Sequence, residues 1–188
     1  MPSGRTHDRL IWWGLPFVIG ITYAGTRQGG LTVVTSVGYL FSGLMFGPDL
    51  DIHSVQYKRW SWLRWVWLPY RQLLRHRSYF SHGFLLGTLF RLLYVATWGS
   101  LILLVSLAIA RWIQPQTAPD WLTWGQSLKT FWQYYGPESI AFLVGLELGA
   151  MNHAVSDYLG STWFKPKPSR RKSSPLSKSP RRRRKTKS

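Results

Sequence analysis

The chain has 188 residues, of which 45% are hydrophobic, and its 24 Lys and Arg against seven Asp and Glu give a net charge of +17. The apolar content excludes a chain that is disordered throughout. The absence of cysteine excludes disulfides, thiolate zinc sites, thiol nucleophiles and iron–sulfur clusters, so any metal must be bound by histidine and carboxylate side chains.

Four long runs of uncharged or nearly uncharged residues follow one another along the chain. Residues 10–26, 28–48 and 92–110 contain 17, 21 and 19 residues without charge, and a helix needs about 20 apolar residues to cross a bilayer. The fourth run, 136–159, contains four ionisable residues, which are Glu138, Glu147, His153 and Asp157. Buried helices of a soluble bundle are the alternative, but a domain of this size cannot cover so many apolar helices. The sequence therefore predicts an all-α, polytopic membrane helical bundle of about four spans.

Lys and Arg residues are unequally divided between the two sides that four spans create. The N-terminus, the loop 49–82 and the tail 165–188 share one side and carry twenty of these residues. The opposite side carries three, which are Arg27, Arg111 and Lys129. Because Lys and Arg favour the cytoplasmic side, both termini are predicted to be cytoplasmic. Residues 1–164 are expected to form one membrane-embedded helical domain.

Residues 165–188 hold twelve of the Lys and Arg residues and no acidic residue. Their Ser- and Pro-rich composition is typical of disorder, so we expect a disordered polybasic tail. Such a tail binds anionic lipid headgroups, at about 1 kcal/mol per cation, or other polyanions. The sequence contains no module for sequence-specific nucleic-acid binding, and it leaves self-association into a homo-oligomer open.

Pairs of glycines four residues apart occur in two of the predicted spans. Gly43 with Gly47, and Gly145 with Gly149, have the small-xxx-small spacing at which membrane helices pack closely. This spacing is common in apolar helices. It therefore predicts close packing and nothing more specific.

The predicted topology gathers all five histidines and four of the seven acidic residues at or near the cytoplasmic face. These residues are His7, His53, His76, His82, His153, Asp8, Asp49, Asp51 and Asp157. Imidazole and carboxylate groups that converge in a chain without cysteine are the usual ligands of zinc, manganese or iron. For each residue alone, the alternative is a hydrogen-bonded structural side chain or a polar cap on a helix.

Two local spacings place candidate ligands on a common face. His153 and Asp157 are four residues apart, so they share a helix face and can reach one ion. Asp49, Asp51 and His53 alternate along the chain, which places them on the same side of an extended segment. In that conformation they form a suitable bridging unit for two metal ions.

Residues 75–82 combine two histidines with two arginines. His76 and His82 are six residues apart, which is not one helical face, so a turn is expected between them. Arg75 and Arg77 flank His76 and could neutralise phosphate charge in a transition state. The alternative role of both arginines is to contact lipid phosphate as cytoplasmic loop cations.

Four motifs taken together resemble a bacterial family of membrane-embedded metal-binding proteins. They are THD at 6–8, GPDLDIH at 47–53, HRSYFSHG at 76–83 and NHAVSDYL at 152–159. That family is similar to membrane-bound metal-dependent hydrolases and, more remotely, to zinc-dependent phospholipase C. The resemblance covers about residues 1–162. It implies a set of metal ligands that comprises His7, Asp49, Asp51, His76, His82, His153 and Asp157, with His53 as a further candidate.

The chain departs from the phospholipase pattern because it lacks a second downstream His/Glu pair. One or two ions are therefore expected rather than three, with zinc first and manganese or iron as alternatives. The expected location is a bacterial inner membrane or an internal membrane, where membrane lipids are partners.

If the protein is an enzyme, the expected reaction is metal-dependent hydrolysis of a phosphoester. A lipid is one candidate substrate because the site lies at the level of the headgroups. A divalent ion would lower the pKa of a bound water to about 7 and polarise a phosphoryl oxygen. Asp51 is the expected general base, with Asp8 as an alternative, and Arg77 is the expected second catalytic residue. The rival hypotheses are a non-catalytic metal-binding or assembly protein, and an ion transporter with Glu147 in its pathway.

Two charged residues lie inside the predicted spans. Glu147 lies six residues inside His153, and Arg91 lies nine residues past His82. At 1.5 Å per residue these offsets correspond to depths of about 9 and 13 Å. An unpaired charge inside a membrane is costly, so we expect Arg91 and Glu147 to form an ion pair within the bundle.

Overall fold

The computed structural model describes residues 4–74, 78–115 and 121–163, and within these ranges it contains helices and no strand. Four helices are long: α1 (Gly4–Thr26), α2 (Gly29–Leu44), α6 (Leu86–Ile113) and α7 (Trp121–Trp163). The short elements between α2 and α6 are η1 (Pro48–Asp51), α3 (Val55–Arg59), η2 (Ser61–Trp67), α4 (Leu68–Leu73) and α5 (Tyr79–His82).

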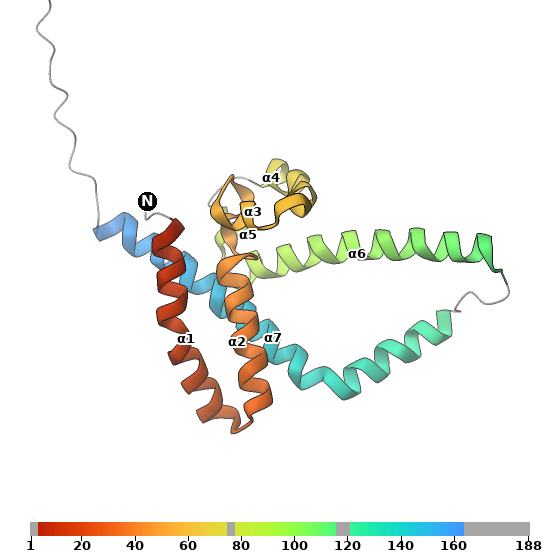
Figure 1. Cartoon of the computed structure of the whole chain (residues 1–188), viewed down its shortest axis with the longest axis horizontal. Coiled ribbons are helices and arrows are strands. Elements are labelled where there is room, and N and C mark those ends of the chain that lie inside the picture. The colour runs from red at the N-terminus through yellow and green to blue at the C-terminus, as the bar shows by residue number, and fades with distance from the viewer. Residues whose placement is uncertain (1–3, 75–77, 116–120, 164–188) are drawn as a thin grey trace, which may run out of the picture.

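The long helices divide the molecule into a body and two arms. In the body, α1 and α2 form a hairpin that α7 crosses, and the short elements form a cap at one end of α2 (Figure 1). The arms are α6 and the N-terminal part of α7, which extend away from the body (Figure 1). Helix α7 bends along its length, and it contains Pro137, which removes a backbone hydrogen bond inside the helix.

Glycines allow the backbones of α2 and α7 to approach closely. A Cβ atom on Gly145 would lie 2.2 Å from the carbonyl oxygen of Thr35, and one on Gly149 would lie 2.4 Å from that of Tyr39. The packing predicted for this glycine pair is therefore confirmed. Gly43 faces Ile11 of α1 instead, where a Cβ would lie 2.3 Å from the side chain.

Hydrogen bonds from buried polar groups join the three helices of the body. The Tyr39 hydroxyl of α2 donates to the carbonyl oxygen of Ile11 in α1 at 3.0 Å. The amide nitrogen of Asn152 in α7 donates to the carbonyl oxygen of Leu10 at 3.2 Å, and also to the Tyr39 hydroxyl. These bonds fix the rotation of α1 against α7 next to His153.

The cap contains the densest group of aromatic side chains. Trp67 and Tyr70 are fully buried, and they pack with Phe46, Leu50 and Leu146 in the main hydrophobic core. Tyr94 of α6 donates a hydrogen bond from its hydroxyl to the carbonyl oxygen of Val66, which attaches the arm to the cap. The cap therefore holds the ends of α2 and α6 together.

Three segments are long and apolar enough to cross a membrane: Gly29–Asp51, Leu86–Ile113 and Thr123–Tyr158. Helix α1, which contains the predicted span 10–26, is not among them. The count of four spans and the cytoplasmic position of both termini stay predictions. The predicted tail, 165–188, lies outside the described residues.

Candidate metal centre

Helices distant in sequence bring five of the predicted ligands together at one end of the body. His7 lies at the end of the first turn of α1, Asp49 in η1 shortly after α2, and His82 at the end of α5. His153 and Asp157 lie on one face of α7, as their spacing predicts. The close packing of α1 and α2 against α7 is what places these side chains side by side.

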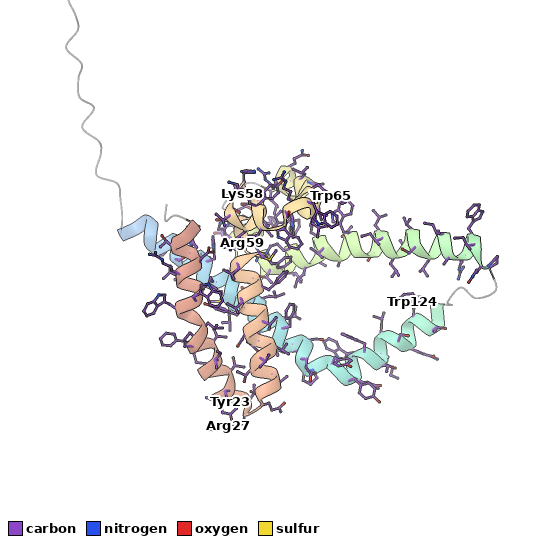
Figure 2. The ribbon with its side chains drawn as sticks, viewed as in Figure 1. Tyr23, Arg27, Lys58, Arg59, Trp65 and Trp124 are labelled. Atoms are coloured by element: carbon purple, nitrogen blue, oxygen red, sulfur yellow. The ribbon has the colours of Figure 1, made fainter. Side chains whose placement is uncertain are left out.

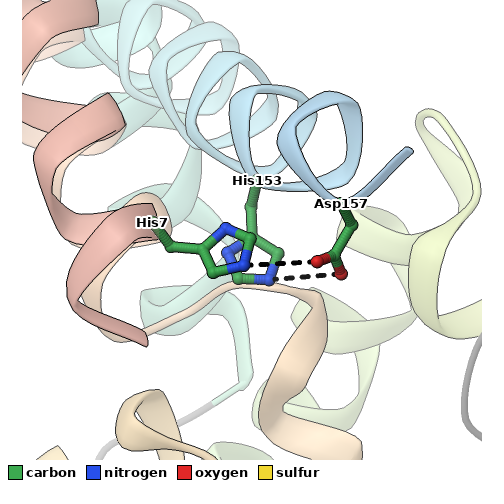
Figure 3. Close-up of side chains that lie close together, drawn as sticks. All are labelled: His7, His153 and Asp157. Carbon is green, nitrogen blue, oxygen red and sulfur yellow. Dashed lines mark ion pairs between the residues drawn. The ribbon is translucent and has the colours of Figure 1, made fainter. Parts of the chain in front are cut away.

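The first ligand set is formed by His7, His153 and Asp157, and all three side chains are buried (Figure 3). The two imidazole rings are stacked, with centroids 4.2 Å apart. Nε2 of His7 lies 3.2 Å from Oδ1 of Asp157, and Nε2 of His153 lies 3.9 Å from Oδ2. Ligand atoms that share an ion at about 2.1 Å in a tetrahedron are about 3.4 Å apart, so these separations suit one ion.

Hydrogen bonds around Ser156 assign the tautomer of His7. The Ser156 hydroxyl donates its hydrogen to the carbonyl oxygen of His153 at 2.7 Å, so it accepts from Nδ1 of His7, also at 2.7 Å. A neutral His7 then has its lone pair on Nε2, which faces the carboxylate of Asp157. Two acceptors this close repel each other unless a proton or a metal ion lies between them.

The second ligand set is formed by Asp49, His82 and Asp157. Oδ1 of Asp49 lies 3.7 Å from Nε2 of His82, and Oδ2 lies 3.1 Å from Nε2 of His153. Asp157 belongs to both sets, so its carboxylate lies between them. The two sets therefore offer either one ion with alternative ligands or two ions that share Asp157.

Buried polar atoms at this centre indicate that a cation fits it. Oδ1 of Asp49 and Nδ1 of His153 are buried without a hydrogen-bond partner among the described residues. Nε2 of His153 is also buried, and the carboxylate of Asp49 lies 3.1 Å from it. The partly buried carboxylate of Asp49 and the buried carboxylate of Asp157 also lie close together, which is costly unless positive charge compensates them. Imidazole and carboxylate donors of this kind suit zinc, manganese or iron.

Asp51 approaches His82 from the edge opposite Asp49. Its Oδ2 lies 3.9 Å from Nδ1 of His82, and the Ser81 hydroxyl lies 2.8 Å from the same nitrogen. The prediction that residues 49–53 are extended is wrong, because Pro48–Asp51 form a 3₁₀ turn. With about three residues per turn, Asp49 and Asp51 leave the backbone in different directions and reach two edges of one ring.

Two other described candidates, His53 and Asp8, do not join this cluster. His53 is exposed, and its ring packs against Tyr57 at 5.4 Å. Asp8 forms a bidentate ion pair with Arg59, at 2.6 and 3.0 Å. His76 and Arg77 lie outside the described residues.

Sequence reasoning missed the groups that hold the ligands in place. Ser156 and Ser81 bond the Nδ1 atoms of His7 and His82. Arg59 bonds Asp8, the neighbour of His7, and also donates to the carbonyl oxygen of Leu44 at 2.8 Å. Ser81 directly precedes His82, and Ser156 directly precedes Asp157, so their position inside the motifs was the available signal.

The predicted ion pair between Arg91 and Glu147 is not formed, although both residues line one cavity. The Arg91 guanidinium donates to the carbonyl oxygen of Ser81 at 2.9 Å and to the Thr88 hydroxyl at 3.0 Å. Oε1 of Glu147 accepts from the backbone N–H of Leu85 at 2.9 Å. The carbonyl group of Ser81 in α5 and the Thr88 hydroxyl therefore bind Arg91, and the backbone N–H that precedes α6 binds Glu147.

The fold and the two ligand sets define a helical protein with a candidate histidine–carboxylate metal centre. The chain belongs to the family described as "Uncharacterized metal-binding protein (DUF2227)", whose model matches residues 2–167. This match confirms the predicted metal-binding family, and it gives no support to the resemblance to hydrolases or to phospholipase C.

One curated relative is an "Uncharacterized protein" of Aquifex aeolicus (strain VF5), which is 40% identical over 60 residues. The aligned part is 31% of this chain and 42% of the relative, so the match spans less than half of that protein. No solved structure matches the chain.

Proposed function

We propose that this metal-binding protein is an integral membrane hydrolase that cleaves a phosphoester at the cytoplasmic face of the membrane. The observation that carries the proposal is the overlap of two ligand sets at Asp157, next to a cavity that His82 also lines. Paired metal sites beside a cavity are a common arrangement for phosphoester hydrolysis. A divalent cation bound there supplies a Lewis acid that activates water and offsets charge on a phosphoryl oxygen.

The residues around the ligands have distinct roles in this proposal. Ser156 keeps the Nε2 lone pair of His7 directed at the centre, and Ser81 and Asp51 orient His82. We assign Asp51 to positioning His82, in place of the general-base role expected from the sequence. We assign Asp8 to holding the first turns of α1 through Arg59, because its carboxylate is already bound there.

Membrane integration is supported by the exposure of the arms. No part of the apolar window of α6 is buried in the protein, and its mean hydropathy is 2.2. Side chains project into open space around α6 and the N-terminal part of α7 (Figure 2). Water would solvate such a surface poorly, whereas lipid would cover it.

The two ends of the α1–α2 hairpin also carry the residue types of membrane interfaces. Lys58, Arg59 and Trp65 lie on the cap, and Tyr23 and Arg27 lie at the far end of the hairpin (Figure 2). Aromatic and basic side chains favour the headgroup layers. The metal centre is at the cap end, which we assign to the cytoplasmic side, where the basic tail would meet anionic lipid.

Elemental analysis of the detergent-purified full chain, combined with a phosphoesterase screen, tests this proposal. We expect one to two zinc ions per chain, with manganese or iron as alternatives, and their loss in the double variant His153→Ala/Asp157→Ala. Metal-dependent release of phosphate from a phosphoester, absent in the double variant, would support the hydrolase. A wild-type chain that binds no metal after reconstitution would contradict the whole proposal.

A non-catalytic metal-binding or assembly role is the second candidate, and one observation favours it. His7, His153 and Asp157 are all buried, and a closed ligand set is typical of a structural metal site. Asp49 and His82 are only partly buried, which favours an accessible site. Stoichiometric metal without hydrolysis of any phosphoester in the screen would select this second role.

A further inference from the structure

A cavity of about 150 Å³ lies between α5, the start of α6 and α7, directly beside the metal centre. His82 belongs both to its wall and to the second ligand set. Arg91 and Glu147 supply its charged groups, and most of the remaining lining is apolar. We call it the Arg91–Glu147 cavity.

Each of the two charged residues has one buried atom without a hydrogen-bond partner in the described structure. Arg91 is 1% exposed, its two terminal nitrogens are bonded to Ser81 and Thr88, and its side chain also interacts with the Tyr70 hydroxyl. Its Nε donates no further hydrogen bond among the described residues. Glu147 is bonded to Leu85 through Oε1, and its Oε2 is buried and unpartnered. A buried charged group without a partner is costly, so a ligand that bonds both atoms would be stabilised.

The opposite charges of these atoms limit the chemistry of that ligand. A phosphate placed between them would be repelled by Glu147, and an ammonium group would be repelled by Arg91. A hydroxyl group satisfies both, because it accepts from Nε of Arg91 and donates to Oε2 of Glu147. A cavity of this volume holds about six non-hydrogen atoms, which is the size of a short polyol.

We propose that the Arg91–Glu147 cavity binds the hydroxyl-bearing alcohol part of a phosphoester whose phosphoryl group lies at the metal centre. This inference rests on the proposed hydrolase function and adds the substrate class to it. Phe84 and Val155 line the cavity and are 61% and 51% exposed, so its mouth is apolar. The alcohol can therefore belong to a free polyol phosphate or to the headgroup of a lipid.

Binding measured by calorimetry on the metal-loaded, detergent-purified full chain tests the inference without turnover. The probes are sn-glycerol 3-phosphate, propyl phosphate, which lacks its hydroxyls, and inorganic phosphate. We expect glycerol 3-phosphate to bind at least about tenfold more tightly than either of the others, because a hydroxyl bonded to charged groups contributes on that scale. Equal affinities of the three probes would overturn the inference.

Two variants of α7 test whether the preference for glycerol 3-phosphate arises in the Arg91–Glu147 cavity. Glu147→Gln is expected to reduce the preference for glycerol 3-phosphate to less than about threefold, because the amide donates where the carboxylate accepted. Glu138→Gln, the same change on the same helix outside this cavity, is expected to keep the preference. Metal content is expected to equal that of the wild type in both, and an unchanged preference in Glu147→Gln would reject the assignment.

Val155→Trp covers the case in which Glu147→Gln fails to fold. Val155 is exposed at the mouth, so the larger side chain is tolerated there and narrows the entrance. We expect weaker binding of glycerol 3-phosphate and unchanged binding of inorganic phosphate. If glycerol 3-phosphate binds as strongly as in the wild type, the cavity is not its site.

The same experiment separates the inference from the hydrolase proposal and identifies the source of the alcohol. A hydroxyl preference without hydrolysis would keep the cavity and reject the enzyme, whereas hydrolysis without a preference would do the reverse. Lysophosphatidylglycerol presents a hydroxyl-bearing head on an acyl chain. Binding tighter than that of glycerol 3-phosphate would assign the site to lipid, and weaker binding would assign it to a free phosphoester.

Discussion

The body and the arms of this protein use apolar residues in opposite ways. In the body, helices α2 and α7 approach so closely that Gly145 and Gly149 leave no room for a side chain, and polar groups are buried between them. In the arms, Leu104 and Ile102 of α6 are 55% and 63% exposed on a helix whose apolar window has no buried residue. Contacts between helices therefore hold the candidate metal centre, whereas no described residue buries the apolar window of α6.

The largest expected effect concerns the metal at the centre of the body. Asp157→Ala is expected to remove essentially all bound metal, because this carboxylate belongs to both ligand sets. His7→Ala and His82→Ala each remove a ligand of one set, so about half of a two-ion content is expected to remain. Elemental analysis of the purified variants measures this, with Leu104→Ala in the arm as the control. Equal loss in all three variants would contradict two sites.

The next effect concerns the arms and tests the proposal that lipid covers them. Leu104→Asp is expected to reduce membrane insertion, because an aspartate at the centre of a membrane helix costs about 3 kcal/mol. Leu73→Asp is the matched control, since Leu73 is 71% exposed on the cap and outside the candidate spans. Carbonate extraction followed by immunoblotting measures the membrane fraction. Retention of both variants in the membrane would argue against α6 as a span.

The third prediction compares the same Gly→Ala change in the body and in one of the arms. Gly145→Ala is expected to lower the free energy of unfolding by about 1–3 kcal/mol, because its Cβ would lie 2.2 Å from the carbonyl oxygen of Thr35. Gly99→Ala in α6 meets nothing within 4 Å and is expected to leave stability unchanged or raise it by up to about 1 kcal/mol. Denaturant titration in detergent, followed by circular dichroism, measures both. A destabilising Gly99→Ala would mean that α6 has a protein partner.

The smallest expected effect tests the contact that holds the first turns of α1. Asp8→Asn weakens a partly exposed ion pair with Arg59, so we expect a loss of less than about 1 kcal/mol in stability. Metal affinity is expected to fall by no more than about fivefold, because His7 keeps its bond to Ser156. A competition titration with a chelator measures the affinity, and Arg9→Gln is the neighbouring control. A complete loss of metal in Asp8→Asn would make Asp8 a ligand.

Local spacing predicted the part of the site that a single helix determines. His153 and Asp157 face the same way because four residues make about one turn of α7. The partnership of His7 with Asp157 joins the two ends of the described chain, and no spacing rule specifies such a contact. It depends on the packing of α1 against α7, which the predicted glycine pairs did not indicate, because Gly145 and Gly149 contact α2.

Predictions based on backbone shape or on depth alone were less accurate. The prediction that Asp49, Asp51 and His53 share one side assumed an extended segment, but Pro48 begins a 3₁₀ turn there. Comparable depth predicted an ion pair between Arg91 and Glu147, and the two residues line one cavity without forming it. It could not foresee that the carbonyl group of Ser81 and the N–H group of Leu85 would bind them first.

The order in which the ligands are synthesised has a consequence for how the protein matures. His7 and its hydrogen-bond partner Ser156 are 149 residues apart, so His7 leaves the ribosome long before Ser156 and Asp157 exist. Until α7 has been made, neither ligand set is complete, because both require Asp157. If the proposed centre binds metal, a chain that stalls before α7 would lack both complete sets. Bound metal would then report that synthesis and folding have proceeded as far as Asp157.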